Sequence, residues 1–390
     1  MATPVLRLGA PAEGALVLPQ AAPTPSYLYA PRGVHWDDTV CVVADTGNHR
    51  VLIWHGVPTA DGAPADVVLG QPDFESEGPN AGGTDRTRGL HLPTGVSVID
   101  GRLVVADAWN HRILVWDAVP QRSFAAPDVI LGQPAPDDDA PNQGRNAPTA
   151  TSLYWPYGFG VVDGTFYVAD TGNRRVLGWE GGLPAPGDAP SILLGQDAPT
   201  ERLENRGVGV GPTTFRWPHA IAGDADRLLV ADAGNHRVLM WEPPLGEDRP
   251  ADGLLGQETF DTAHELPYDA QGPSRLRFPY ALDGDGRRLA VADTANNRVL
   301  LWNDVAPTAR CASADAVLGQ PDFDANGENQ WTAVADDTLC WPYGLCLHGD
   351  RLAIADSGNN RVMVWSLADD PTAPASSPDA TAEAPRPHPA

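Results

Sequence analysis

One motif with side chains that could carry out chemistry recurs six times in this sequence. It reads Ala-Asp-x-x-Asn-x-Arg, and its aspartates are Asp45, Asp107, Asp170, Asp232, Asp293 and Asp356. A carboxylate close to a guanidinium could serve in general acid–base catalysis. A feature present in every repeat, however, cannot mark one site. We therefore interpret the motif as a structural ion pair across a tight turn, with its asparagine in the left-handed position of that turn.

A second set of candidates follows a proline that also recurs six times. The residues directly after these prolines are Arg32, Thr94, Tyr157, His219, Tyr280 and Tyr343. Histidine, tyrosine and arginine are suitable types for acid–base work. Four of the residues directly before the prolines are aromatic, namely Trp155, Trp217, Phe278 and Trp341. Because this set varies between repeats while the motif does not, it is the better candidate for a site.

Both sets belong to one structural repeat. The motif aspartates are separated by 62, 63, 62, 61 and 63 residues. A third marker, Leu-Gly-Gln, keeps the same phase, with its glycine at Gly70, Gly132, Gly195, Gly256 and Gly319. Each repeat holds four short runs rich in β-branched and aromatic residues, bounded by Gly, Asp and Asn turns, which is the pattern of β-strands.

Four antiparallel strands per repeat, arranged radially, predict an all-β fold, a six-bladed β-propeller. The sixth repeat lacks the Leu-Gly-Gln strand. Residues 5–9 have that pattern, and Gly9 precedes Gly70 by one repeat of 61 residues. This N-terminal strand is therefore expected to complete the last blade and close the ring. The propeller domain would span residues 1–366, and the Pro- and Ala-rich residues 367–390 would form a disordered tail.

The repeat text Ala-Asp-Thr-Gly-Asn-His-Arg-Val-Leu at 44–52 resembles the NHL-repeat family. Five further copies extend the resemblance to about residue 366, and it implies a β-propeller of the NHL type. It is specific for fold and not for function, because NHL propellers include amidating lyases, streptogramin-type lyases, sensor domains and RNA- or protein-binding modules. The lyases use histidine with tyrosine or arginine at the channel mouth, usually with a divalent metal.

The first strand of a propeller blade lines the central channel, so the residues after the prolines are expected at the channel mouth. The predicted ligand-binding residues are Arg32, Thr94, Tyr157, His219, Tyr280 and Tyr343, with Trp155, Trp217 and Trp341 beside them. Connections of about 20 residues between repeats would form a crown above this mouth, and loops of that length are often functional. Tyr157 and His219 are expected to lie outside the core between blades, so that alanine there would spare stability.

Two functions stay open at this point. The favoured hypothesis is a non-enzymatic module that binds a small ligand, a peptide or a protein through the channel mouth. The alternative is a metal-assisted lyase or hydrolase that resembles the NHL amidating or streptogramin-type lyases. Only one mouth position is histidine, so no multi-histidine zinc site is visible, although loop carboxylates could hold calcium. No catalytic residue or metal ligand is assigned, and a calcium or zinc cofactor stays open.

The residue before each motif arginine is histidine in three repeats, at His49, His111 and His236. Three histidines could suggest zinc, but zinc ligands must lie about 2 Å from one ion. Equivalent positions in different blades of a propeller lie on a wide ring, so these three side chains are too far apart to share one ion. These histidines are therefore expected to be exposed turn residues.

Charge and cysteine usage restrict the partners and the compartment. The chain has 51 acidic residues against 26 basic ones, a formal net charge of −25, and no lysine. The negative electrostatic field of such a chain disfavours nucleic acids and anionic membranes as partners. The sequence starts without a signal-peptide pattern, and no apolar run reaches the roughly 20 residues of a membrane span. The cysteines (Cys41, Cys311, Cys340 and Cys346) favour free thiols in a cytoplasmic monomer, with a Cys311–Cys340 bridge as the alternative.

Overall fold

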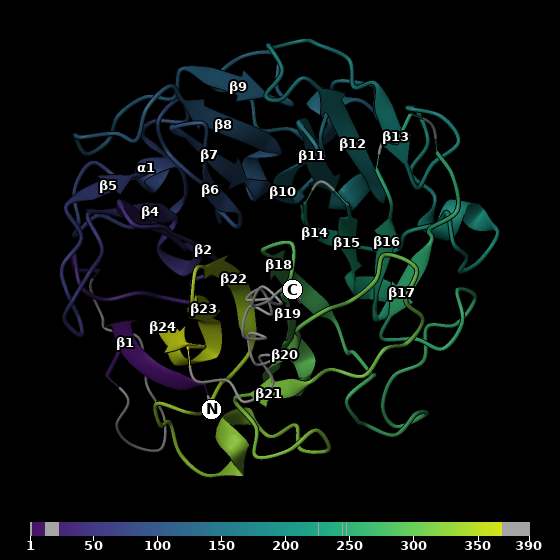
Figure 1. Cartoon of the computed structure of the whole chain (residues 1–390). Helices are drawn as coiled ribbons and strands as arrows, with labels where there is room; N and C mark the ends of the chain where they lie inside the picture. Colours follow the sequence, from purple (N-terminus) through teal and green to yellow (C-terminus); the bar gives the residue numbers. More distant parts are fainter. Residues whose placement is uncertain (1, 12–22, 225, 244, 247, 369–390) are drawn as a thin grey trace, which may run out of the picture.

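Six four-stranded antiparallel sheets surround one central axis in the computed structural model, which confirms the predicted six-bladed β-propeller (Figure 1). In every blade the first strand lies at the axis and the last one at the outside. The C-terminal tail expected over 367–390 falls outside the described residues from 369 onward. The structure describes residues 2–11, 23–224, 226–243, 245–246 and 248–368.

The strands of the first three blades follow the predicted repeat. Blade 1 contains β2 (Gly33–Trp36), β3 (Val40–Asp45), β4 (Arg50–His55) and β5 (Val67–Leu69). Blade 2 contains β6 (Val96–Ile99), β7 (Arg102–Asp107), β8 (Arg112–Trp116) and β9 (Val129–Leu131). Blade 3 contains β10 (Pro156–Val162), β11 (Thr165–Asp170), β12 (Arg175–Glu180) and β13 (Ile192–Leu194).

The other three blades repeat this order, except that the outer strand of the last one comes from the start of the chain. Blade 4 contains β14 (Pro218–Gly223), β15 (Leu228–Asp232), β16 (Arg237–Trp241) and β17 (Gly253–Leu255). Blade 5 contains β18 (Pro279–Gly284), β19 (Leu289–Asp293), β20 (Arg298–Trp302) and β21 (Ala316–Leu318). Blade 6 contains β22 (Pro342–His348), β23 (Arg351–Asp356), β24 (Arg361–Ser366) and β1 (Thr3–Gly9).

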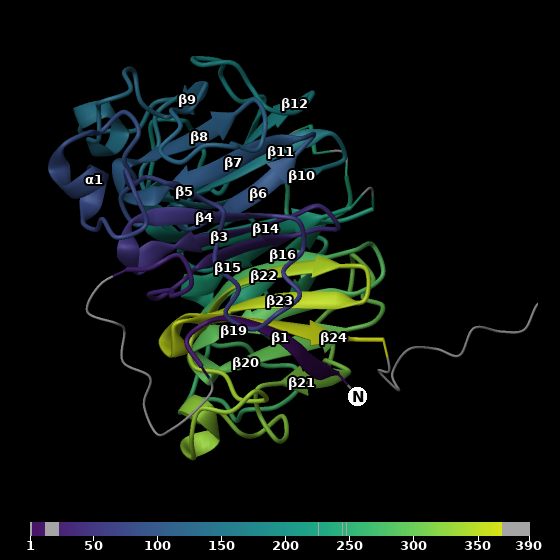
Figure 2. The same ribbon diagram turned by 90° about the vertical axis from the view of Figure 1, so that its left-hand side faces the viewer.

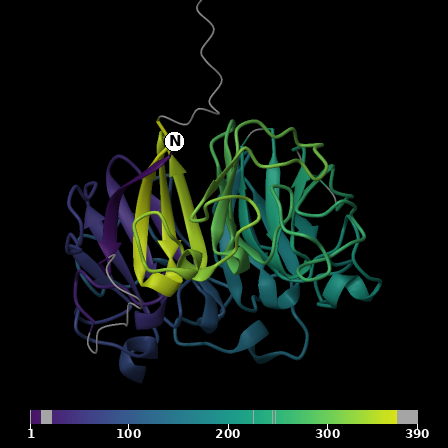
Figure 3. The same cartoon turned by 90° about the horizontal axis from the view of Figure 1, so that it is seen from below.

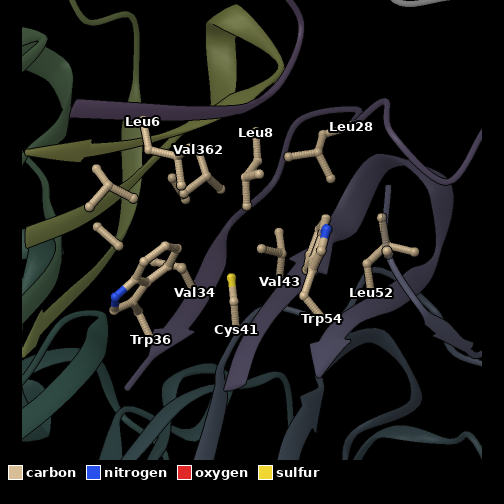
Figure 4. Close-up of a cluster of buried hydrophobic side chains, with 14 of the residues drawn as sticks. Leu6, Leu8, Leu28, Val34, Trp36, Cys41, Val43, Leu52, Trp54 and Val362 are labelled. Atoms are coloured by element: carbon tan, nitrogen blue, oxygen red, sulfur yellow. The ribbon is translucent and has the colours of Figure 1, made fainter. Parts of the chain in front are cut away.

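The hydrophobic core lies between neighbouring blades, because each sheet is apolar on both faces. One cluster joins blades 6 and 1, and it packs Trp36 and Trp54 against Leu6, Leu8 and Val362 (Figure 4). Comparable clusters of buried residues join the other pairs of adjacent blades. The tryptophans predicted as core, one on the third strand of each blade, are all buried: Trp54, Trp116, Trp179, Trp241, Trp302 and Trp365.

The N-terminal strand closes the ring, as the repeat spacing predicts. β1 pairs antiparallel with β24, with Thr3 opposite Ser366 and Gly9 opposite Arg361 (Figure 3). The strand thus begins two residues earlier than expected. Its side chains alternate, with Leu8 completely buried and Val5 45% exposed. One face of β1 therefore belongs to the core between blades, as a half-buried edge strand requires.

The motif forms a buried ion pair beside a single turn of 3₁₀ helix. In blade 1 the Arg50 Nε donates to the Asp45 carboxylate at 2.7 Å, and both side chains are fully buried. The prediction for the turn was wrong in one respect. Asn48 lies within the 3₁₀ helix, and the next residue, His49, has the left-handed φ of 55°. These turns are η1 (Thr46–Asn48), η2 (Ala108–Asn110), η4 (Thr171–Asn173), η6 (Ala233–Asn235), η7 (Thr294–Asn296) and η9 (Ser357–Asn359).

The motif arginine also holds the long connections between blades. Arg175 donates to the carbonyl of Pro199 and to those of Thr149 and Ser152, at 2.7–2.9 Å. A buried guanidinium needs such partners for its remaining N–H groups. The connections carry short helices on one face of the ring; Figure 2 shows the ring from the side, with α1 on this face. These helices are α1 (Pro79–Gly83), η3 (Pro141–Gly144), η5 (Glu204–Gly207) and η8 (Glu328–Trp331).

The cysteines and the helices bear on two further expectations. All four cysteines are free, including Cys311 and Cys340, so the alternative bridge between these two is absent from the structure. Cys41 and Cys340 are buried. Within the described ranges, no helix is long and apolar enough to cross a membrane.

Candidate functional site

Two hydrogen bonds fix the chain just before each proline that begins a blade. The motif aspartate accepts the amide two residues before the proline, as Asp170 does from Tyr154 at 2.7 Å. A side chain of the preceding blade accepts the next amide, as His111 Nδ1 does from Trp155 at 3.0 Å. Trp155 has a left-handed φ of 54°. The residue after the proline, Tyr157, is thereby aimed at the channel.

The histidines expected in exposed turns are instead acceptors between blades, and that prediction was wrong. His111 is 9% exposed and His236 3%. Burial lowers the pKa of His111 to about 4, so the ring is neutral and offers a lone pair to the amide. Four other blades form the equivalent hydrogen bond at 2.9–3.2 Å. The amides of Leu92, Phe278, Trp341 and Ala30 donate to the side chains of His49, His236, Asn297 and Asn360, respectively.

Blade 4 departs from this pattern. The preceding blade has Arg174 at the position where the other blades have histidine or asparagine, and a guanidinium has no acceptor. The backbone of Trp217 does not have a left-handed φ, and its amide donates instead to the Asp232 carboxylate at 3.2 Å. His219 Nδ1 lies 2.9 Å from the carbonyl oxygen of Trp217. Since a carbonyl only accepts, the proton of the neutral ring lies on Nδ1 and the Nε2 is unprotonated.

The predicted mouth residues come together as a closed ring of side chains. Tyr157 and His219 have their ring centres 4.3 Å apart, and His219 and Tyr280 4.5 Å. Tyr280 stacks on Tyr343 at 4.8 Å. The Arg32 guanidinium lies 4.6 Å over the Tyr343 ring and 3.5 Å from the Tyr157 hydroxyl, which completes the circle.

The ring is more buried than expected. Tyr157 is 4% exposed and His219 2%, so both are buried at the channel, although neither belongs to the clusters between blades that the described residues form. Thr94, the sixth mouth residue, is 1% exposed and donates its hydroxyl to the Tyr157 carbonyl at 2.6 Å. These side chains therefore contribute to the packing of the channel as well as to its mouth.

Arg32 carries the charge of this ring at neutral pH. Burial lowers the pKa of His219 to about 3, and burial raises the pKa of Tyr280 to about 12 and that of Tyr157 further. The tyrosines are thus protonated and the imidazole is neutral. Such a ring offers hydrogen bonds, aromatic faces and one cation.

Two cavities adjoin the ring. The first, of about 240 Å³, is the channel itself, lined by the first strands of all six blades. Deeper in the channel, burial raises the pKa of Asp283 to about 6. The second cavity, of about 470 Å³, lies beside the mouth over blade 5. It is lined by Trp217, Phe278, Tyr280, Trp331, Trp341, Arg277, Ala295, Asn297, Asn326 and Glu328.

Sequence reasoning found part of this second cavity. Trp217 and Trp341 were predicted beside the mouth and line it. Trp331 and Glu328, both in η8, were missed. The available signal was Trp331 itself, a tryptophan in an otherwise polar connection between repeats.

The ligand set for a zinc site does not assemble at the mouth. Among the six mouth positions there is one imidazole and no carboxylate, and zinc sites need three or four N, S or O ligands. Across the part of the chain that the structure describes, no group of three or more His, Cys, Asp or Glu side chains is placed to hold a metal ion.

The fold is that of a six-bladed β-propeller, and the comparisons connect its repeat with the NHL repeat. Residues 90–116 match the NHL repeat. The NHL repeat-containing protein 2 of Bos taurus is 25% identical over 355 residues, covering 84% of this chain and 44% of the relative. The human protein of that name is 24% identical, covering 88% and 47%. This chain thus spans less than half the length of these relatives. The matched repeat and these relatives support the NHL-repeat β-propeller family for this chain.

A second human relative and one solved structure are also similar. The human NHL repeat-containing protein 3 is 33% identical over 134 residues, covering 34% of this chain and 33% of the relative. The virginiamycin B lyase of Staphylococcus aureus, a solved structure, has 12% identity and a TM-score of 0.41. The match covers 88% of this chain and 97% of that one.

Proposed function

We propose that this propeller is a binding module that holds a small ligand, a peptide or a protein segment at the face around its channel mouth. The observation that carries the proposal is a group of exposed aromatic side chains on that face. Trp109 is 46% exposed, Trp331 77% and Trp341 38%. Large exposed aromatic groups on a strongly acidic surface are typical of interaction sites.

These aromatic groups are continuous with the mouth ring. The ring centres of Trp109 and Trp155 are 6.2 Å apart. The ring centre of Trp155 lies 6.1 Å from that of Tyr157 and from that of His219. Trp341 lines the second cavity together with Tyr280 of the ring. A ligand at the mouth could therefore contact rings on several blades at once, and pockets for small molecules are typically lined by aromatic side chains.

Binding is favoured over the lyase alternative by the burial of the acid–base groups. A general base must come within hydrogen-bond reach of the proton that it removes. His219 and Tyr157 are 2% and 4% exposed and pack against each other. The large aromatic groups that are open to a ligand on this face are tryptophan rings, which stack and do not transfer protons.

The net charge of −25 supports a neutral or cationic partner over a nucleic acid or an anionic membrane. The packing of β1 into blade 6 satisfies the sheet edge within one chain, which supports a monomer.

Ligand-detected NMR with a panel of sugars, organic acids, organic cations and short peptides tests the proposal. A Trp109→Ala/Trp341→Ala double variant removes two exposed rings of the mouth face, and Val5→Ala on the outer strand of blade 6 is the control. Panel members that bind should lose at least about tenfold in affinity in the double variant and nothing in the control. Binding that survives the double variant, or an absence of binding by every class, contradicts the proposal.

A further inference from the structure

The cavity beside the mouth has aromatic walls. Trp217 stacks with Phe278 at 6.3 Å, and Phe278 stacks with Tyr280 at 6.3 Å, so these three rings form a continuous surface. Trp331 and Trp341 also line the cavity. Within the described residues these two tryptophans contact no other aromatic ring, so their faces are left to the cavity and to solvent.

Trp341 is held in place by hydrogen bonds, and the Trp331 ring packs on the backbone of its own turn. The Trp341 indole N–H donates to Glu328 Oε1 at 2.9 Å, and its backbone amide donates to Asn297 Oδ1 at 2.9 Å. The Trp331 ring lies against Gly327, where an added Cβ would come within 2.4–2.7 Å of it. A side chain at Gly327 would thus displace the ring. Rings fixed before a ligand arrives reduce the entropy lost on binding.

The unpaired charge of this cavity is negative. Arg277 Nε donates to Glu265 Oε2 at 2.7 Å, so a carboxylate compensates its charge. Glu328 forms no ion pair with any residue that the structure describes, and its carboxylate accepts only the neutral indole of Trp341. The chain as a whole carries a net charge of −25, which adds to the attraction of a cation.

These features together define the chemistry of the ligand. The face of an aromatic ring attracts cations within about 6 Å of its centre. A primary ammonium or a guanidinium needs acceptors for several N–H groups, whereas a fully methylated ammonium needs none. An anion would be repelled by Glu328. The volume of about 470 Å³ suits a small molecule.

We propose that this cavity is an aromatic cage for a small organic cation that carries a quaternary methylammonium group, with Glu328 as its counter-ion. The proposal rests on the proposed function and names the class of ligand that the mouth face takes. Trp331 and Trp341 supply the open side of the cage, and Phe278 and Tyr280 supply its inner wall.

Titration calorimetry at low salt with choline tests this directly, with 3,3-dimethyl-1-butanol as its uncharged isostere. Choline should bind at least about tenfold more tightly than the isostere. Trp331→Ala and Glu328→Gln should each weaken choline binding at least about fivefold. Tyr29→Ala, an exposed aromatic residue that does not line this cavity, and Glu75→Gln, an exposed acid elsewhere, are the matched controls and should change nothing.

The contrary outcomes separate this inference from the proposed function. Equal binding of choline and its isostere, or equal loss in the Tyr29→Ala control, overturns the cation cage. If choline fails to bind at 10-millimolar levels while other panel compounds bind at the mouth, the cage is wrong and the binding module stands. If no compound of any class binds, both are wrong.

Discussion

Leu8 offers a direct test of the way in which the ring closes. It is completely buried on β1, in the cluster between blades 6 and 1 with Leu28 and Val362 (Figure 4). Leu8→Ala should cost about 3 kcal/mol of the free energy of unfolding, within the range of 2–5 for buried leucines. With a urea m-value of about 3 kcal/mol/M for a domain of this size, the unfolding midpoint should fall by about 1 M.

Urea unfolding followed by tryptophan fluorescence and by far-UV circular dichroism measures this shift, and coincident curves would support a two-state transition. Val5→Ala is the matched control, because Val5 lies on the same strand and is 45% exposed. It should change the free energy of unfolding by less than about 0.5 kcal/mol. If both variants unfold at the midpoint of the parent, β1 does not stabilise the ring and the reasoning about closure is refuted.

Three further predictions use other parts of the molecule. Arg175→Met leaves the buried Asp170 carboxylate without its cation, and should cost about 3–5 kcal/mol in the same assay; a cost below 1 would contradict a structural role. The folded pKa of His219, about 3, lies below its unfolded value of 6.5. The unfolded chain therefore binds the proton first, and stability present above pH 6.5 should fall by about 1.4 kcal/mol per pH unit as the pH drops towards 3. His219→Gln should reduce the measured slope by this contribution; an imidazole NMR signal assigned to His219 and titrating near pH 6 would disprove it. Finally, electrophoretic shift assays at physiological salt should show no salt-sensitive micromolar complex with DNA or RNA; such a complex would contradict the argument from charge.

The path of the backbone could be predicted from the sequence to a large extent. The phase of the repeat determines where each strand begins, and the spacing between Gly9 and Gly70 predicts the place of β1 in blade 6. The residues at the channel mouth followed from the same phase, because the first strand of every blade lies at the axis. Whether they bind a ligand is still a prediction.

The partners of individual side chains could not be predicted in this way. The period shows where His49 and His111 lie along the chain, but not that each reaches an amide of the next blade. One signal was available, because five of the six repeats have histidine or asparagine at this position and both offer an acceptor at similar reach. Arg174 is the exception, and the backbone of Trp217 changes beside it.

The closure of blade 6 by β1 also has a consequence for the order in which this protein assembles. β1 is made before all six blades that follow it in the chain, and its partner β24 lies more than 350 residues later. At about 5–20 residues per second, β1 waits for tens of seconds before it can pair. Bridging so long a loop is entropically costly, and contacts of such high sequence separation form slowly. The ring therefore closes last, and until then the emerging chain exposes two unpaired strand edges that a chaperone could cover.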